Sequence, residues 1–100
     1  MAGFDEIKRL INRDQFLITK HARARMFERN ITTDVMIEII VNGQVIEEYP
    51  DDFPCPSFLI LGFCNEMPLH VVIAFFNDHV RIITAYKPEK SRWENFKKRK

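Results

Sequence analysis

The segment LHVVIAFFNDHVRIITAYK, residues 69–87, decides the fold of this chain. Two runs rich in β-branched and aromatic residues flank an Asn-Asp turn signal, a pattern typical of a β-hairpin. Alternate residues of the first run are expected to face the core: Leu69, Val71, Ile73 and Phe75. The opposite set is also largely apolar, so we expect that second face to be covered by the terminal segment, a partner or a substrate.

The length of the turn decides which residues meet across this hairpin. A three-residue loop places His70 opposite Tyr86, with Thr84 on the same face of the sheet. A two-residue loop instead places His70 opposite Ala85, and the grouping is lost. The sequence leaves both registers open, and it also leaves open whether this histidine is catalytic or a hydrogen-bonded, half-buried structural residue.

The flanking sequence extends the hairpin into an α+β fold. Apolar periodicity predicts helices over residues 3–13 and 20–29, and a third that Thr32 caps and Gly43 ends. The expected strands are 44–49, 57–63, 69–76 and 80–87. Because the last connections are too short for parallel crossovers, we predict N-terminal helices packed on one face of a mostly antiparallel four-stranded sheet.

Three further segments flank or follow these elements. Residues 16–18 are interpreted as a connector or a brief strand. Trp93 and Phe96 lie on a closing segment that is compatible with a helix. The basic end of the chain, residues 97–100, is interpreted as an electrostatic face or a solvated end.

Composition narrows the class of protein. One hundred residues fit a single domain, residues 1–100, and an apolar share of 46% supplies a core and excludes disorder. The longest apolar run, 69–76, is far shorter than the roughly 20 residues that cross a bilayer. The charged opening residues do not form a signal peptide, so we expect a cytoplasmic protein that has no membrane partner, with both cysteines reduced.

The segment KHARARMFERN, residues 20–30, concentrates four cations and a histidine in a chain of net charge +1. On a helix, His21, Arg25, Glu28 and Arg29 share an arc of about 100°. Arg25 and Glu28 are spaced to form an ion pair with each other. Alternatively, the guanidinium groups hold phosphate oxygens, and the histidine, a residue type that titrates near neutral pH, acts as acid or base.

The sequence carries no motif for nucleotide binding, serine hydrolysis or zinc chemistry. The chain has no Gly-rich phosphate loop, GxSxG or HExxH sequence. Its histidines and cysteines lack the paired CxxC or HxxxH spacing of a zinc site, so we predict no metal and no cofactor.

Three separated motifs resemble the bacterial domain-of-unknown-function family numbered 4258. They are a His-x-x-x-Arg-Met-x-x-Arg segment, a Gly-x-x-Ile-Glu turn and a late Thr-x-Tyr. The matching residues are His21, Arg25, Met26 and Arg29, then Gly43, Ile46 and Glu47, then Thr84 and Tyr86. The resemblance runs from about Phe16 to Lys98.

That family is similar in organisation to the RelE/ParE-like toxins, which pack two N-terminal helices on a curved antiparallel sheet. The resemblance implies the toxin of a bacterial toxin–antitoxin pair that cleaves RNA without a metal, as an mRNA interferase does. It implies His21 or His70 as acid or base, with Tyr86 orienting or stacking a base. The implied phosphate and RNA ligands are Arg25, Arg29 and Thr84.

The resemblance also implies a second reading and a partner. ParE-like relatives act on a protein target and cleave nothing, so the alternative is a non-enzymatic, protein-binding inhibitor or interaction module. Family members are often encoded beside a small zinc-finger protein, which would be the antitoxin. The sequence leaves open whether the chain forms a homo-oligomer. In contrast to strongly basic RelE-like nucleases, this chain is nearly neutral and carries an acidic patch over residues 47–52.

Overall fold

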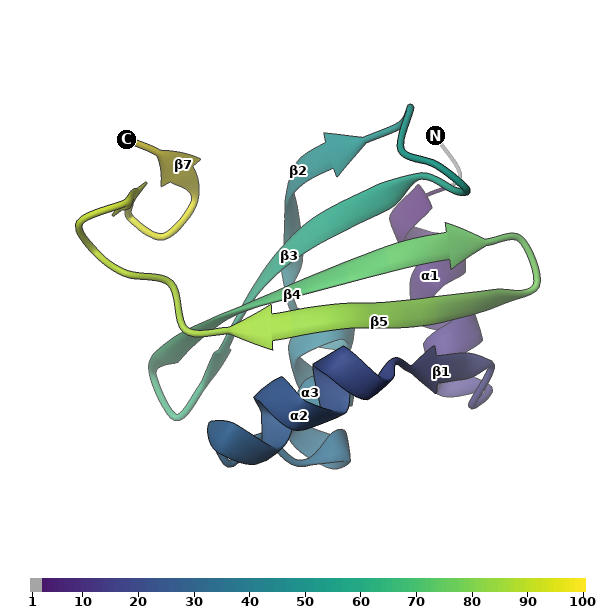
Figure 1. Cartoon of the computed structure of the whole chain (residues 1–100), viewed down its shortest axis with the longest axis horizontal. Coiled ribbons are helices and arrows are strands. Elements are labelled where there is room, and N and C mark those ends of the chain that lie inside the picture. Colours follow the sequence, from purple (N-terminus) through teal and green to yellow (C-terminus); the bar gives the residue numbers. More distant parts are fainter. Residues whose placement is uncertain (1–2) are drawn as a thin grey trace.

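The predicted hairpin lies within the main sheet of the computed structural model, which describes residues 3–100. The elements in chain order are α1 (Gly3–Asn12), β1 (Phe16–Ile18), α2 (Lys20–Glu28), α3 (Thr33–Asn42), β2 (Gln44–Tyr49), β3 (Ser57–Cys64), β4 (Met67–Phe76), β5 (His79–Tyr86), β6 (Trp93–Glu94) and β7 (Lys98–Arg99). The strand order in the main sheet is β1-β5-β4-β3-β2 (Figure 1). The predicted α+β class is confirmed.

The predicted number of strands is wrong. Within residues 3–100 the main sheet has five strands, because β1 pairs in parallel with the outer edge of β5. The other three pairings are antiparallel, as expected. Residues 16–18 form the brief strand of the two alternatives expected there. Local pattern could not place this strand in the sheet, because its partner lies more than sixty positions away.

The register of the hairpin combines features of both sequence-based alternatives. The turn has two residues, since Phe76 pairs with His79. The register then shifts by one residue, and Ile83 is the extra residue of a β-bulge in β5. The bulge offsets the short turn, so His70 lies opposite Tyr86. The structure thus has the two-residue turn of one alternative and the His70–Tyr86 pairing of the other.

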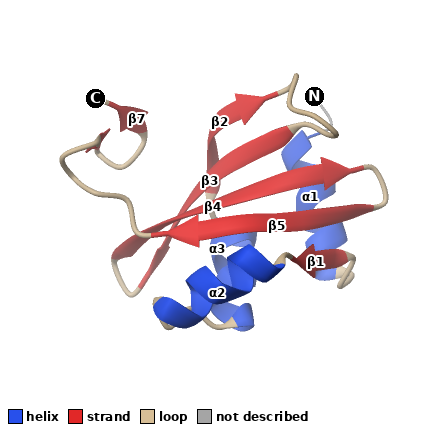
Figure 2. Ribbon diagram, viewed as in Figure 1, coloured by secondary structure: helices blue, strands red, loops and turns tan. Residues whose placement is uncertain are grey.

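The helices pack on one face of the sheet (Figure 2). Buried apolar residues of all three helices join those of β3, β4 and β5 in one cluster, which includes the predicted Leu69, Val71 and Ile73, with Phe75 packed against it. Since neighbouring residues of a strand point to opposite faces, His70 is turned away from the helices. Within residues 3–100 no helix has the length and apolarity needed to cross a membrane.

Local capping explains where two helices begin. The hydroxyl of Thr19 accepts from Ala22 N at 3.1 Å to cap α2, and it also donates to the carbonyl of the bulge residue Ile83 at 3.2 Å. Thr32 caps α3 as predicted, accepting from Val35 N at 3.1 Å. The start of α2 is therefore tied to the bulge that sets the hairpin register.

Gly43 follows α3 as predicted, but for a different reason. Its φ of −88° lies outside the left-handed region that favours glycine at a helix end. A Cβ there would lie 2.4 Å from Ile39 O and 2.6 Å from Leu61 O. The glycine is required because α3 and β3 approach each other closely.

The closing segment is not a helix. After β5 the chain turns back beside the sheet, where β6 and β7 form a separate two-stranded sheet (Figure 1). Trp93 is buried, with its ring against His70 at a centroid distance of 4.5 Å. The terminal segment therefore covers part of the second sheet face, one of the three occupants expected from the sequence.

Candidate functional site

The sequence-predicted site residues fall into two groups. His21, Arg25 and Arg29 belong to α2 or its C-terminal end, and His70, Thr84 and Tyr86 belong to β4 and β5. Because α2 packs on one face of the sheet while His70 points to the other, the structure does not bring His21 and His70 together.

Two of the helical residues face solvent. His21 is exposed in the first turn of α2. Arg25 Nη1 binds Glu28 Oε1 at 2.6 Å, and both side chains are about half exposed. This ion pair is the simpler of the two readings that the helical arc allowed, and exposed pairs of this kind add little stability.

His70 is the most completely enclosed polar side chain of this sheet face. It is fully buried, and both ring nitrogens have partners: Nε2 lies 2.7 Å from Phe96 O, and Nδ1 lies 3.2 Å from Tyr86 Oη. A carbonyl oxygen only accepts, so Nε2 carries the proton and donates to Phe96. In the neutral ring Nδ1 is then an acceptor, and the Tyr86 hydroxyl donates to it.

The electrostatic environment keeps this pair uncharged. Burial lowers the pKa of His70, against the opposing effects of the Phe96 carbonyl and the Glu47 carboxylate, while Arg99 lowers it further. Burial raises the pKa of Tyr86; Arg99 opposes this shift and Glu47 adds to it. At neutral pH the imidazole of His70 is therefore neutral and the phenol of Tyr86 stays protonated.

Glu47 completes this group and was not assigned a catalytic role from the sequence. Its carboxylate accepts from Arg99 Nε at 3.0 Å and from the Tyr49 hydroxyl. Glu47 pairs with Leu59 of β3 at a shift in the β2 register. The Gly-x-x-Ile-Glu motif contained Glu47, but β2 is far from β5 in the sequence, and no local pattern connects its carboxylate to His70.

Thr84 joins the same sheet face without joining the hydrogen-bonded pair. It is half-buried and lies opposite Val72, two residues before Tyr86. Its hydroxyl forms no side-chain hydrogen bond within residues 3–100, the part of the chain that the structure describes. It is available as a polar contact near the His70–Tyr86 pair.

A basic cavity adjoins the pair. Arg29, Lys87 and Lys90 line a cavity of about 900 Å³, together with Phe96 and two glutamates, Glu66 and Glu89. Phe96 connects the two features, since its carbonyl binds His70. Lys87 also follows Tyr86 directly in the chain. Of the helical cations predicted to bind phosphate, Arg29 is thus the one that lies beside the sheet group.

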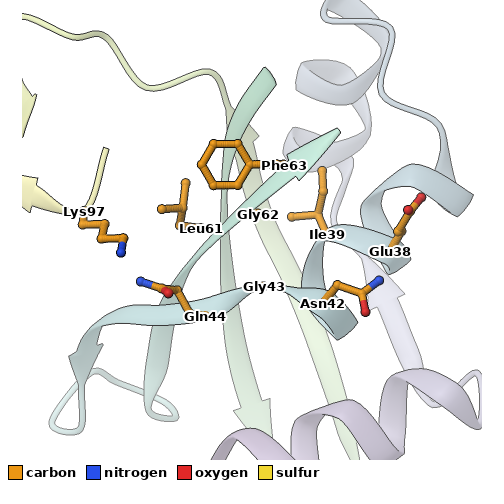
Figure 3. Close-up of a pocket in the computed structure, with 9 residues that line it drawn as sticks. All are labelled: Glu38, Ile39, Asn42, Gly43, Gln44, Leu61, Gly62, Phe63 and Lys97. Atoms are coloured by element: carbon orange, nitrogen blue, oxygen red, sulfur yellow. The ribbon is translucent and has the colours of Figure 1, made fainter. Parts of the chain in front are cut away.

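A second cavity, of about 290 Å³, lies where α3 meets β3 (Figure 3). Gly43 and Gly62 are part of its wall, and Glu38, Gln44 and Lys97 provide polar groups around it. It contains none of the sequence-predicted site residues. Its shape follows from the same close approach of α3 to β3 that requires glycine at position 43.

The described residues offer no cluster for a metal. Across residues 3–100, no three His, Cys, Asp or Glu side chains stand close enough together to hold an ion. Cys55 and Cys64 are free thiols.

Comparison with known proteins identifies a family. No curated protein and no solved structure was matched. The family model described as domain of unknown function DUF4258 matches residues 18–87, which run from the end of β1 to the residue after β5. This match includes the bulged hairpin, Glu47 and Arg29, and it covers more than half of the sequence. The chain therefore belongs to the DUF4258 family.

Proposed function

We propose that this protein is a metal-independent endoribonuclease, the toxin of a bacterial toxin–antitoxin pair with a RelE/ParE-like fold. The observation that carries the proposal is the hydrogen-bonded pair of His70 and Tyr86 beside a cavity with three cations. N-terminal helices on a mostly antiparallel sheet support the fold assignment. A small zinc-finger antitoxin belongs to the same proposal through the family resemblance, and a cytoplasmic location belongs to it through the charged opening residues of the sequence.

The chemistry needs a proton acceptor, cations and a positioned RNA phosphate. The 2′-oxygen of a ribose attacks the adjacent phosphorus, and the Tyr86 hydroxyl turns from His70 Nδ1 to the phosphate. The 2′-proton passes to Nδ1, which is the ring nitrogen of the neutral imidazole that carries no proton. The bond from phosphorus to the 5′-oxygen breaks, leaving a 2′,3′-cyclic phosphate. The departing 5′-oxygen takes a proton from the imidazolium so formed or from water.

The neighbouring side chains stabilise this reaction by position and charge. Arg29 and Lys87 hold phosphate oxygens from the cavity, and Tyr86, which stays protonated, donates a hydrogen bond to the reacting phosphate. Glu47 lies close enough to favour the imidazolium electrostatically.

Two cleavage assays test the proposal: a mixed-sequence single-stranded RNA, free in EDTA, and a message in a translating extract that keeps the Mg²⁺ its ribosomes need. We expect the wild type to leave 2′,3′-cyclic or 3′-phosphate ends. We expect Arg29→Ala and His70→Gln to remove this activity. Arg25→Ala is the matched control, since Arg25 pairs with Glu28 on the helix surface and its loss should leave cleavage unchanged. Intact RNA in both settings would refute the proposal.

A protein-binding module is the second candidate, because large apolar side chains are exposed. Phe27, Phe63 and Met67 are 85%, 54% and 47% exposed, and Met67 also lines the basic cavity. Exposed apolar groups beside cations suit a partner segment that is both acidic and apolar. Tight binding of such a segment that is lost in Phe27→Ser, without any RNA cleavage, would favour this function over the nuclease.

A further inference from the structure

The segment after β5, residues 88–100, lies against the main sheet without pairing with any of its strands. Its strands β6 and β7 pair with each other in a separate sheet rather than extending the main one. Backbone hydrogen bonds from Lys97 N to Glu94 O and from Lys100 N to Arg92 O hold it together internally, each at 3.0 Å. We call this segment the C-terminal strap.

The strap contacts the groups to which we assign chemistry. The Phe96 carbonyl accepts a hydrogen bond from Nε2 of His70. The Trp93 ring stands edge-on to the same imidazole, with an angle of 88° between the two ring planes. Arg99 donates a hydrogen bond to the carboxylate of Glu47, and its guanidinium carbon lies 4.6 Å from the centroid of the Trp93 ring. His70 is left with no exposed surface. A substrate therefore reaches His70 only when the strap moves.

Features of the strap favour such movement. A two-stranded sheet with two residues in each strand is marginally stable by itself. Asn95 and Phe96 have φ values of 52° and 63°, in the left-handed region that a bulky residue such as phenylalanine rarely adopts. The strained Phe96 backbone is the one that holds the His70 contact. The side chain of Arg99 is 62% exposed even while it binds Glu47.

The strap lies outside the family match, which ends at Lys87. Its last four residues are all cations and all exposed, so a polyanion attracts them away from the sheet. Phosphate groups compete with the Glu47 carboxylate for Arg99, because a guanidinium binds both. The strap thus blocks the site and also carries the charges that a nucleic acid draws toward it.

We propose that residues 88–100 form an autoinhibitory strap, which shields His70, Tyr86 and Glu47 until a single-stranded nucleic acid displaces it. The assignment of these groups to RNA cleavage rests on the function proposed above. The shielding itself is a property of the fold and is measurable whether or not RNA is cut. In the closed state the protein is latent, and in the open state the imidazole and the carboxylate are both accessible.

Two probes report on the strap directly in the full chain. Trp93 is the single tryptophan, so its emission wavelength and its quenching by acrylamide follow strap opening. Modification by diethyl pyrocarbonate, mapped by peptide mass spectrometry, measures access to His70, with exposed His21 as an internal reference. A thymidine oligonucleotide of about 20 nucleotides is the ligand probe, because it binds through phosphates but lacks the 2′-hydroxyl needed for cleavage.

Arg99→Ala is the opening variant, and Lys98→Ala is a control of equal charge on the next residue. We expect Arg99→Ala to raise the His70 modification rate about two- to fivefold, the range for an ion pair of this exposure, and to shift Trp93 emission to the red. Lys98→Ala should leave both probes unchanged. The oligonucleotide should open the wild type in the same way without lowering the urea midpoint of the main sheet, because a ligand that binds the folded state does not destabilise it.

The proposal is overturned if His70 stays unreactive in Arg99→Ala and with the oligonucleotide, and Trp93 changes only at the urea concentration that unfolds the sheet. The strap would then be a fixed part of the core. If His70 becomes reactive but RNA is not cut, the strap is supported and the nuclease assignment fails. Cleavage of RNA while His70 stays protected refutes the strap, because catalysis would then proceed without opening.

Discussion

The close approach of α3 to β3 gives a prediction whose sign is decided by structure. Gly62 lies in the interior of β3, where glycine normally weakens a strand, so an exposed alanine would add stability. Here a Cβ would lie 2.5 Å from Ile39 Cγ2, 2.8 Å from Ile39 O and 3.0 Å from Ile39 Cα. Two of these are backbone atoms, so relief requires α3 to move. Gly62→Ala should therefore destabilise the protein.

The magnitude follows from two opposing effects. Overpacking a tight site costs about 1–3 kcal/mol, and removing glycine from the unfolded chain returns about 0.4–1 kcal/mol. At these contact distances we expect a net loss of about 2 kcal/mol, which lowers the melting temperature of a domain of this size by roughly 8–16 °C. Thermal unfolding followed by far-ultraviolet circular dichroism measures the shift, and urea unfolding gives the free energy.

A second substitution tests the cause. Leucine at position 39 has no Cγ2 branch, so Ile39→Leu removes the shortest contact and leaves the two backbone contacts. The loss caused by Gly62→Ala should be smaller in the Ile39→Leu background than in the wild type, and a double-mutant cycle measures this coupling. An alanine at position 62 that is neutral or stabilising in the wild-type background would refute the close approach.

Three further outcomes test the site and its supports. Burial lowers the pKa of His70 in the folded state, so the unfolded chain binds the proton first as the pH falls. The free energy of unfolding should therefore be highest above about pH 6.5 and should decline below that pH. Urea unfolding at several pH values should show a smaller decline in His70→Gln. Thr19→Ala removes the α2 cap and the bond to Ile83, costing about 1–3 kcal/mol in urea unfolding, whereas Thr19→Ser, which keeps the hydroxyl, should cost less than half as much. Arg25→Ala should change the free energy of unfolding by less than about 0.5 kcal/mol, because its pair with Glu28 is solvent-exposed; a larger loss would show that this ion pair is structurally important.

The hairpin shows how far local pattern reaches. Alternating apolar residues and an Asn-Asp turn identified both strands and the core-facing set, because these features depend on neighbours within a few positions. The sequence left open whether His70 pairs with Tyr86, because it tied that pairing to a three-residue turn that the structure does not have. The pairing depends on the bulge at Ile83, whose carbonyl is bound by the hydroxyl of Thr19, a residue 64 positions away.

The candidate site was harder to predict than the fold. His70, Tyr86 and Arg29 were predicted as site residues. In the structure His70 binds both Tyr86 and the Phe96 carbonyl, and Phe96 lines the same cavity as Arg29. His21 and Arg25 shared a helical arc with Arg29, but sharing a helix face does not place residues beside a sheet group. Glu47 was missed as a member of the group, because only strand order brings β2 within electrostatic reach of His70.

The sequence by itself determined the α+β class, the helix cap at Thr32 and the apolar face of β4, since each depends on residues close together in the chain. Only the tertiary structure decided the fifth strand, the hairpin register and the position of the C-terminal strap over His70. These depend on contacts between distant segments. Such contacts form where buried area and hydrogen bonds outweigh the entropy of closing long loops, and no local periodicity records that balance.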